Sequence, residues 1–413
     1  NKGLLEKHAM LGNALVDMYA RCGDVRRAQD VFDRLIVRDI VSWNTLIAAY
    51  AHSGHSHEAL NCFDQMQREG LSSNRITFIC ILKACGQIGA IDMGEKIHGM
   101  IASKGLLEQT TVLGSALVEM YAKCGKLWKA QAVFTELPVQ DVISWNALIE
   151  GYIQHGKGID ALKCFEHVQS DGVSPNAVTF TCAVKACSCI KAINKGKQLH
   201  KEIVNRGLLE KSIELGNSLV SMYAKCGDLE RAQEVLNGLP VRDVVSWSAL
   251  ISGHVQECEC REALNCLERI QAEGLSPNAI TFTSILKACS IKGAIEKGKQ
   301  IHEKILRLDL LVNDNVLGNA LIDMYAKCGA LSKARHVLED LVLHDVVSWN
   351  ALIAGYNQQG QCLEALDCFE QMQREGVSPD VVTYICIMKS CGIIQSLEKG
   401  KHIHEMLKSK GLL

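Results

Sequence analysis

The chain has 413 residues and a formal net charge of −2 at pH 7, with 48% hydrophobic and 5% aromatic residues. This balance argues against a nucleic-acid binder that relies on overall positive charge, although it still allows cations concentrated along one face. No apolar run approaches the length of a membrane-spanning helix, no signal or transit peptide is visible, and the first residue is Asn rather than Met, which is typical of a segment excised from a longer protein.

A six-residue motif recurs along the chain at a constant spacing. It reads MYARCG at 18–23 and MYAKCG at 120–125, 222–227 and 324–329, so successive copies lie 102 residues apart. The tryptophans Trp43, Trp145, Trp247 and Trp349 follow the same spacing. A fixed period of this kind predicts a repeat array, whose units stack along one body instead of forming separate globular domains.

Each block of 102 residues divides into three helical hairpins that differ in amino-acid sequence and length. Segment 111–141 has 31 residues, 142–176 has 35 and 177–212 has 36. In a later copy, Trp349, Leu352, Ile353 and Tyr356 have the i, i+3, i+4, i+7 spacing of an amphipathic helix, and Gly360 follows as a stop signal. The pattern predicts helix–turn–helix units that bury their apolar faces only by stacking on neighbours.

The alternating lengths and the segments VVSWNALI, LKACS and NALIDMYAKCG resemble the PLS subclass of plant pentatricopeptide repeat proteins, over the whole chain. The tetratricopeptide repeat is a poorer match, because it has Gly four residues after the Trp and a uniform period of about 34 residues. That place is occupied here by Ile47, Ile149, Ile251 and Ile353. The resemblance implies an all-α fold, a right-handed α-solenoid superhelix of stacked hairpins.

The expected repeat boundaries follow from this resemblance. Short-type repeats are expected at 9–39, 111–141, 213–243 and 315–345, standard repeats at 40–74, 142–176, 244–278 and 346–380, and long-type repeats at 75–110, 177–212 and 279–314. Residues 1–8 are expected to be the end of a long-type repeat, and residues 381–413 a truncated long-type repeat.

The resemblance also implies that single-stranded RNA lies along the first helices, with one base selected by the fifth and the last residue of each repeat. An Asp at the last position accepts a hydrogen bond from the imino N–H of uracil or guanine, whereas an Asn amide donates to the ring nitrogen of cytosine or adenine. At the fifth position, a short Ser or Thr leaves room for a purine, and Asn suits a pyrimidine.

The residue pairs at these positions imply an RNA preference in chain order. U is expected at Asn13 with Asp39, C with U tolerated at Asn44 with Asn74, G at Ser115 with Asp141, C or U at Asn146 with Asn176, U at Asn217 with Asp243, A at Ser248 with Asn278, and U at both Asn319 with Asp345 and Asn350 with Asp380. Thr283 with Asp314 resembles a G reader but belongs to a long-type repeat, and the long-type pairs Ile79 with Thr110 and Thr181 with Ser212 specify no base.

Alternatives stay open for these residues. An Asn or Asp before a helix also serves as an N-cap, although capping does not explain the choice between Asn and Ser at the fifth position. The cations Arg21, Lys123, Lys225 and Lys327 lie eight residues after the fifth position, about 80° further around the helix. They are either contacts to RNA phosphates or ordinary solvated side chains.

No constellation for catalysis, metal binding or cofactor binding accompanies the repeats. His200 to Glu202 forms the HxE half of a zinc-deaminase signature, but the chain has no Pro-Cys pair for the second half. We therefore predict no enzyme activity, no bound metal or cofactor, no small-molecule substrate and no membrane association.

The function that the resemblance implies is sequence-specific binding of single-stranded RNA, as the recognition array of an organellar C-to-U RNA editing factor. An editing deaminase or accessory editing factors would act in trans, and the location would be the chloroplast or the mitochondrion. The alternative is an α-solenoid scaffold for protein–protein interactions, which the same hairpins would support.

Overall fold

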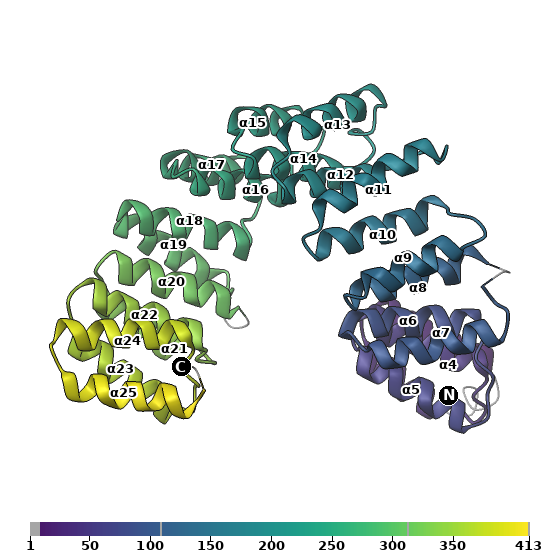
Figure 1. Ribbon diagram of the computed structural model, residues 1–413, viewed down its shortest axis with the longest axis horizontal. Coiled ribbons are helices and arrows are strands. Elements are labelled where there is room, and N and C mark those ends of the chain that lie inside the picture. The colour runs from purple at the N-terminus through teal and green to yellow at the C-terminus, as the bar shows by residue number, and fades with distance from the viewer. Residues whose placement is uncertain (1–8, 108–109, 312–313, 412–413) are drawn as a thin grey trace. The chain divides into compact units, whose positions relative to one another are not determined.

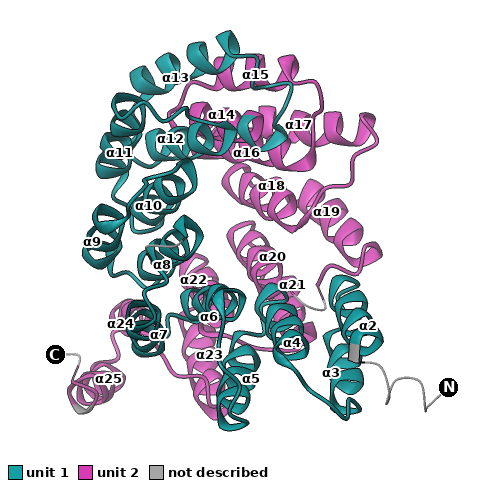
Figure 2. Ribbon diagram, turned by 90° about the vertical axis from the view of Figure 1, so that its right-hand side faces the viewer, with its two compact units in different colours: residues 1–215 teal, residues 216–413 magenta. Residues whose placement is uncertain are grey.

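The structure is a computed structural model that describes residues 9–107, 110–311 and 314–411, in which there are 24 α-helices and no β-strand (Figure 1). The expected all-α repeat solenoid is confirmed for these residues. The expected end of a long-type repeat at 1–8 lies outside the described residues. The chain divides into two compact units, unit 1 at residues 1–215 and unit 2 at residues 216–413 (Figure 2).

The helices alternate between the first helix of a hairpin, with an even label, and the second helix, with an odd label. Unit 1 contains α2 (Ala9–Arg21), α3 (Val25–Asp33), α4 (Ile40–His52), α5 (Ser56–Arg68), α6 (Arg75–Ile88), α7 (Ile91–Ser103), α8 (Thr111–Lys123), α9 (Leu127–Glu136), α10 (Val142–Gln154), α11 (Gly158–Ser170), α12 (Ala177–Cys189) and α13 (Ile193–Asn205). Helix α14 (Ile213–Lys225) crosses the border between the units. Unit 2 continues with α15 (Leu229–Gly238), α16 (Val244–Gln256), α17 (Cys260–Ala272), α18 (Ala279–Lys292), α19 (Ile295–Arg307), α20 (Asn315–Lys327), α21 (Leu331–Asp340), α22 (Val346–Gln358), α23 (Cys362–Arg374), α24 (Val381–Ile393) and α25 (Leu397–Ser409).

Local capping residues explain where the first helices begin. Before α4, the side chain of Asp39 accepts a hydrogen bond from the Ser42 backbone over 2.8 Å, and the Asp39 N–H donates to the Ser42 hydroxyl over 3.3 Å. The same reciprocal capping box precedes α6, α12, α16, α18, α22 and α24. Such a box satisfies backbone donors that have no partner inside the helix, so an Asp or Asn followed by Ser or Thr starts a helix reliably.

The first helices form a continuous row within each unit. In unit 1, α2, α4, α6, α8, α10 and α12 each contact the next one, and α16, α18, α20, α22 and α24 do the same in unit 2. Nearly all second helices pack on the first helix of their own hairpin and on the first helix of the next hairpin. The second helices therefore cover one side of the row and leave the other side of the first helices accessible.

The recurring MYAKCG motif contributes to the contacts between neighbouring hairpins. Met120 and Tyr121 are almost fully buried, and the Tyr121 hydroxyl lies 2.9 Å from Nδ1 of His98 in the preceding hairpin. The equivalent contact joins Tyr325 to His302 over 3.0 Å. The copies at 120–125 and 324–329 thus pack against equivalent neighbours, whereas Met18 of the first copy is 41% exposed.

Candidate nucleic-acid interface

On the first helices, the fifth residue of a repeat lies beside the residue that ends the same repeat. Asn44 on α4 donates from Nδ2 to Oδ1 of Asn74, the residue before α6, over 3.1 Å. Asn350 on α22 donates to Oδ1 of Asp380 over 3.0 Å. These residues are 30 positions apart in the sequence, and they meet because the next first helix stacks directly on the previous one.

This hydrogen bond recurs in three further repeats with Asn at the fifth position. The pairs are Asn146 with Asn176 at 3.5 Å, Asn217 with Asp243 at 2.9 Å, and Asn319 with Asp345 at 3.2 Å. In the remaining pair, Asn13 lies beside Asp39 and helps to lower the pKa of its carboxyl group. Most of these side chains are half-buried, as expected for groups on the wall of a groove. The structure therefore brings together six of the residue pairs that the family resemblance singled out.

Helix capping decides which atom of the last residue remains available. Oδ1 of Asn74 accepts hydrogen bonds from the backbone N–H groups of Ile76 and Thr77, over 3.0 and 3.1 Å, in addition to the one from Asn44. Its Nδ2 amide has no hydrogen-bond partner among the described residues, so it remains a donor. Capping and the presentation of a polar atom thus occur on the same side chain.

In Asp380, one carboxylate oxygen remains available where Asn74 leaves an amide, whereas Oδ2 of Asp243 and Asp345 already accepts from the fifth-position Asn. Oδ1 of Asp380 accepts from the Thr383 N–H over 2.8 Å as well as from Asn350, while Oδ2 has no hydrogen-bond partner in the described parts of the chain. Burial raises the pKa of Asp380, but the hydrogen bonds from Thr383 and Asn350 outweigh it and hold the pKa below its ordinary value. The available oxygen is therefore a charged acceptor at neutral pH.

Serine at the fifth position does not reach the last residue in this way, because its hydroxyl bonds to its own helix. Ser115 and Ser248 donate to the carbonyl four residues earlier, over 3.0 and 2.7 Å. Their partners Asp141 and Asn278 still cap α10 and α18. The shorter side chain leaves more room beside the last residue than Asn does.

The long-type repeats show no comparable bridge within the described residues. Thr181 donates to a carbonyl of its own helix over 2.8 Å, and Ile79 is apolar. Oγ1 of Thr110 is buried without a hydrogen-bond partner among the described residues. Asp314 caps α20 over 3.0 Å but is not hydrogen-bonded to Thr283 in the part of the chain that the structure describes.

Three of the four candidate phosphate-binding cations already have an acidic partner four residues earlier. The ion pairs, at 2.6 to 2.8 Å, are Arg21 with Asp17, Lys123 with Glu119, and Lys327 with Asp323. The fourth cation, Lys225, is exposed and has Ser221 at the corresponding position. It forms no ion pair with the described residues, so its charge is available to a ligand.

An exposed aliphatic residue stands near the start of most first helices, and the sequence patterns above did not reveal it. Val41 is 54% and Ile143 60% exposed. The equivalent exposed residues are Ile76, Val112, Val178, Val245, Ile280, Val316, Val347 and Val382. They lie three residues before the fifth position and hence on the same helix face. The signal in the sequence is a branched aliphatic residue that recurs outside the core-facing stripe.

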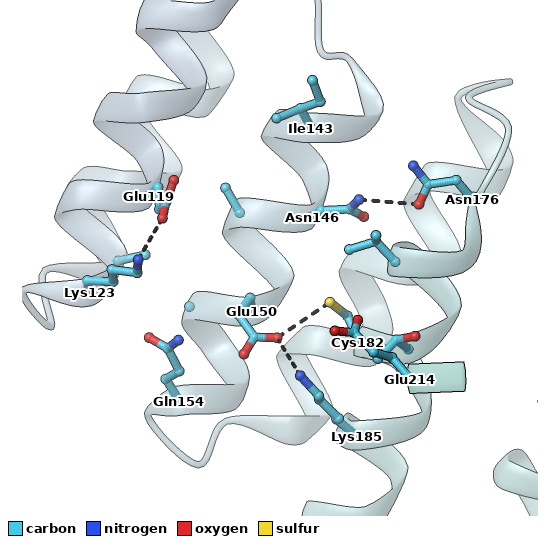
Figure 3. Close-up of a pocket in the computed structure, with 15 residues that line it drawn as sticks. Glu119, Lys123, Ile143, Asn146, Glu150, Gln154, Asn176, Cys182, Lys185 and Glu214 are labelled. Carbon is cyan, nitrogen blue, oxygen red and sulfur yellow. Dashed lines mark hydrogen bonds and ion pairs between the residues drawn. The ribbon is translucent and has the colours of Figure 1, made fainter. Parts of the chain in front are cut away.

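A pocket of about 520 Å³ opens on this surface along α8, α10 and α12 (Figure 3). Its lining includes Asn146 and Asn176, the aliphatic Ile143, and the cations Lys123 and Lys185. Figure 3 shows the Asn146 amide directed towards Asn176. The pocket is also lined by three acidic side chains, Glu119, Glu150 and Glu214, and the first two pair with the two lysines. Its polar groups and apolar wall therefore match the edge and the face of a base, whereas its cations are already neutralised.

Other kinds of site find little support in the described residues. Within 9–107, 110–311 and 314–411, no group of three or more His, Cys, Asp or Glu side chains is arranged to hold a metal ion. No helix in these ranges is both long and apolar enough to cross a membrane. The 19 cysteines are free thiols, and burial raises the pKa of Cys85, for example, to about 12, which disfavours a reactive thiolate.

Two family models match the chain. The model described as the PPR repeat family matches residues 38–87, 140–189, 242–290 and 344–392. The model described as the PPR repeat matches residues 13–40, 115–142, 217–244, 280–310 and 319–346. Together the matches cover well over half of the chain.

Proteins of Arabidopsis thaliana are similar to nearly the whole chain. The pentatricopeptide repeat-containing protein At1g11290, chloroplastic, is 35% identical over 404 residues, which are 98% of this chain and 49% of that protein. The protein At2g03380, mitochondrial, is 32% identical over 388 residues, or 94% of this chain and 56% of that protein. The protein At3g20730 is 33% identical and covers 97% of this chain and 71% of its own length. The chain thus spans about half the length of the first two relatives.

Solved structures share the fold. The pentatricopeptide repeat protein PPR10 in complex with an 18-nt psaJ RNA element matches with a TM-score of 0.70 and 21% identity, covering 97% of this chain and 60% of that chain. PPR10 from maize matches with a TM-score of 0.64 and 20% identity, covering 96% and 63%. At this level of identity, the likeness concerns the fold alone.

Proposed function

Because the chain belongs to the pentatricopeptide repeat family, we propose that it binds single-stranded RNA sequence-specifically, with one base per repeat. The observation that carries the proposal is the hydrogen bond between a fifth-position Asn and the last residue of the same repeat, which occurs in five repeats. It holds two polar side chains together on the accessible side of the first helices, where the edge of one base can meet both.

The capping geometry supports the choice of base. Where the last residue is Asn, the cap occupies Oδ1 and leaves Nδ2 to donate to the ring nitrogen of cytosine or adenine. Where it is Asp, Oδ2 accepts the imino N–H of uracil or guanine, as the sole bond of that oxygen in Asp380 and beside the bond from Asn217 in Asp243. The lowered pKa of both carboxyl groups keeps them charged. The fifth residue then sets the size of the base, with Ser for a purine and Asn for a pyrimidine.

The preferred RNA then reads 5′-U-C-n-G-Y-n-U-A-n-U-U-3′, parallel to the chain, where Y is a pyrimidine and n is not selected. This order takes the eleven complete repeats from 9–39 to 346–380, with a truncated long-type repeat at 381–413. The exposed aliphatic residues near the start of most first helices, such as Val41 and Ile143, support the proposal. They offer apolar surface to the face of a base beside most pairs of fifth and last residues.

The alternation of 31, 35 and 36 residues leads us to assign the array to the PLS subclass, as the recognition part of an organellar C-to-U RNA editing factor. The similarity to proteins named chloroplastic and mitochondrial supports an organellar location. In this proposal the array binds RNA, and an editing deaminase or accessory factors in trans supply the chemistry.

The test is a competition assay with the purified chain and the eleven-nucleotide RNA at a fixed salt concentration. We expect the predicted RNA to compete better than a scrambled RNA of the same composition, and adenine to be preferred at the eighth base. A chain that binds no RNA, or that ranks all sequences equally, would contradict the proposal and favour the protein-binding scaffold.

A further inference from the structure

A lysine follows the fifth position by four residues in every long-type repeat, including the truncated one. These lysines are Lys83, Lys185, Lys287 and Lys389. Four residues turn a helix by about 400°, so each lysine shares a face with the fifth residue and lies about 6 Å further along the helix. The short-type and standard repeats have Asp, Glu, Ser or Ala at this position, so the cation is specific to the repeat type.

Three of these lysines have no counterion in the part of the chain that the structure describes. Lys83 is half-buried, Lys287 and Lys389 are exposed, and none forms an ion pair with another described residue. Lys185 differs, since its Nζ lies 3.7 Å from Oε2 of Glu150 on the preceding first helix. The residues equivalent to Glu150 beside the other three lysines are Ala48, Ser252 and Ala354, which carry no charge.

The position of Lys185 shows what such a lysine faces. Lys185 lines the pocket that also contains Asn146 and Asn176, and Figure 3 shows it next to Glu150 on the same surface. The equivalent lysines occupy the same helical position relative to the accessible side of the first helices. In a chain with a net charge of −2, a ligand that carries many negative charges depends on such local cations.

The long-type repeats also lack the polar amide side chains that select bases in the other repeats. Their fifth residues are Ile79, Thr181, Thr283 and, in the truncated repeat, Ile385. None of these is an amide that bridges to the last residue. A repeat that contributes little to base selection can still contribute a phosphate contact, because phosphate contacts position a nucleic acid without reading its sequence.

We infer that the long-type repeats hold the RNA backbone, with Lys83, Lys287 and Lys389 bound to phosphates, and that Glu150 suppresses the same contact by Lys185. The inference rests on the proposed RNA binding. It makes these lysines determinants of affinity and salt dependence, and it leaves the choice of bases to the short-type and standard repeats.

The first experiment measures binding as a function of salt concentration for wild type and for K83Q/K287Q/K389Q, with the eleven-nucleotide RNA and with its variant that has U at the eighth base. Three lost contacts to a single strand should reduce the slope of log K against log salt by about 2. The electrostatic contribution vanishes at 1 M salt, where the two proteins should bind equally well. A slope difference of about 2 then makes the affinity of the triple variant roughly a hundredfold lower at 0.1 M salt. Both RNAs should lose affinity equally. The matched control is K201Q/K304Q/K401Q, which removes the exposed Lys201 and Lys401 and the half-buried Lys304 from second helices and should leave the slope nearly unchanged.

The second experiment is E150Q, which should release Lys185 and make the slope steeper by about 0.7. A gain of this kind cannot arise from misfolding. The inference alone fails if wild type prefers its predicted RNA while K83Q/K287Q/K389Q behaves like the control triple variant, or if E150Q leaves the slope unchanged. If wild type shows no base preference at all, the proposed function itself fails.

Discussion

The double substitution S248N/N278D should change the preferred eighth base from adenine to uracil. It converts the pair of repeat 244–278 into the pair found at Asn350 and Asp380, whose side chains are 3.0 Å apart. The amide donor left by Asn278 is replaced by a carboxylate acceptor, which matches the imino N–H of uracil and opposes the ring nitrogen of adenine.

The structure indicates that the swap disturbs little else. Ser248 lies 2.6 Å from the hydroxyl of Thr281, and in the equivalent place Thr383 donates to Oδ1 of Asn350 over 2.7 Å, so the new amide finds the same partner. Asp caps a helix about as well as Asn. We therefore expect the free energy of unfolding to change by less than about 0.5 kcal/mol.

The magnitude follows from the cost of one mismatched base, about 1–3 kcal/mol by analogy with DNA readers. Wild type should prefer adenine to uracil by roughly tenfold or more, and the double variant should invert this ratio. The assay is competition among four RNAs that differ only at the eighth base. The matched reverse change, N350S/D380N, should shift the eleventh base from uracil to adenine. If the double variant still prefers adenine, the pairs do not select bases as reasoned here.

Three further predictions concern charge, packing and pH. Lys225→Ala should weaken the binding of all RNAs alike and reduce the slope of log K against log salt by about 0.7, as measured by a salt titration. Gly253→Ala should lower the thermal unfolding midpoint, at a cost of about 1–3 kcal/mol, because a new Cβ would lie 2.7 Å from an alanine Cβ of α14 and 2.8 Å from a leucine methyl of α15. Burial lowers the pKa of His98 and His302, so the unfolded chain binds protons more readily, and stability should fall as the pH drops from 7 to 5 in denaturant titrations.

Each of these predictions has a control within the chain. For the charge, Lys327→Ala removes a cation that is paired with Asp323, so its effect on the slope should be smaller; equal effects would argue against the role of the free cation. For the packing, Gly99→Ala meets open space within its helix and should be neutral or stabilising, and a loss equal to that of Gly253→Ala would refute the steric argument. For the pH, H98Q/H302Q should flatten the dependence, and an unchanged curve would assign it to other groups.

The amino-acid sequence by itself determined the repeat period, the helical hairpins and the positions of the caps. These features are local: a capping pair such as Asp39 and Ser42 acts over three residues, and an amphipathic stripe such as Trp349 to Tyr356 is read within one helix. The i, i+4 ion pair of Lys123 with Glu119 was equally local, and it could have been read from the spacing alone.

Only the tertiary structure decided which side chains meet across repeats. The bond from Asn44 to Asn74 joins residues 30 positions apart, and the pairing of Lys185 with Glu150 joins two different first helices. The exposed face of Val41 and Ile143 likewise becomes visible only when the second helices cover the opposite side. The physical reason is that such contacts depend on how one helix is placed against the next, and this placement is set by the packing of many buried side chains together, not by the residues that meet at the surface.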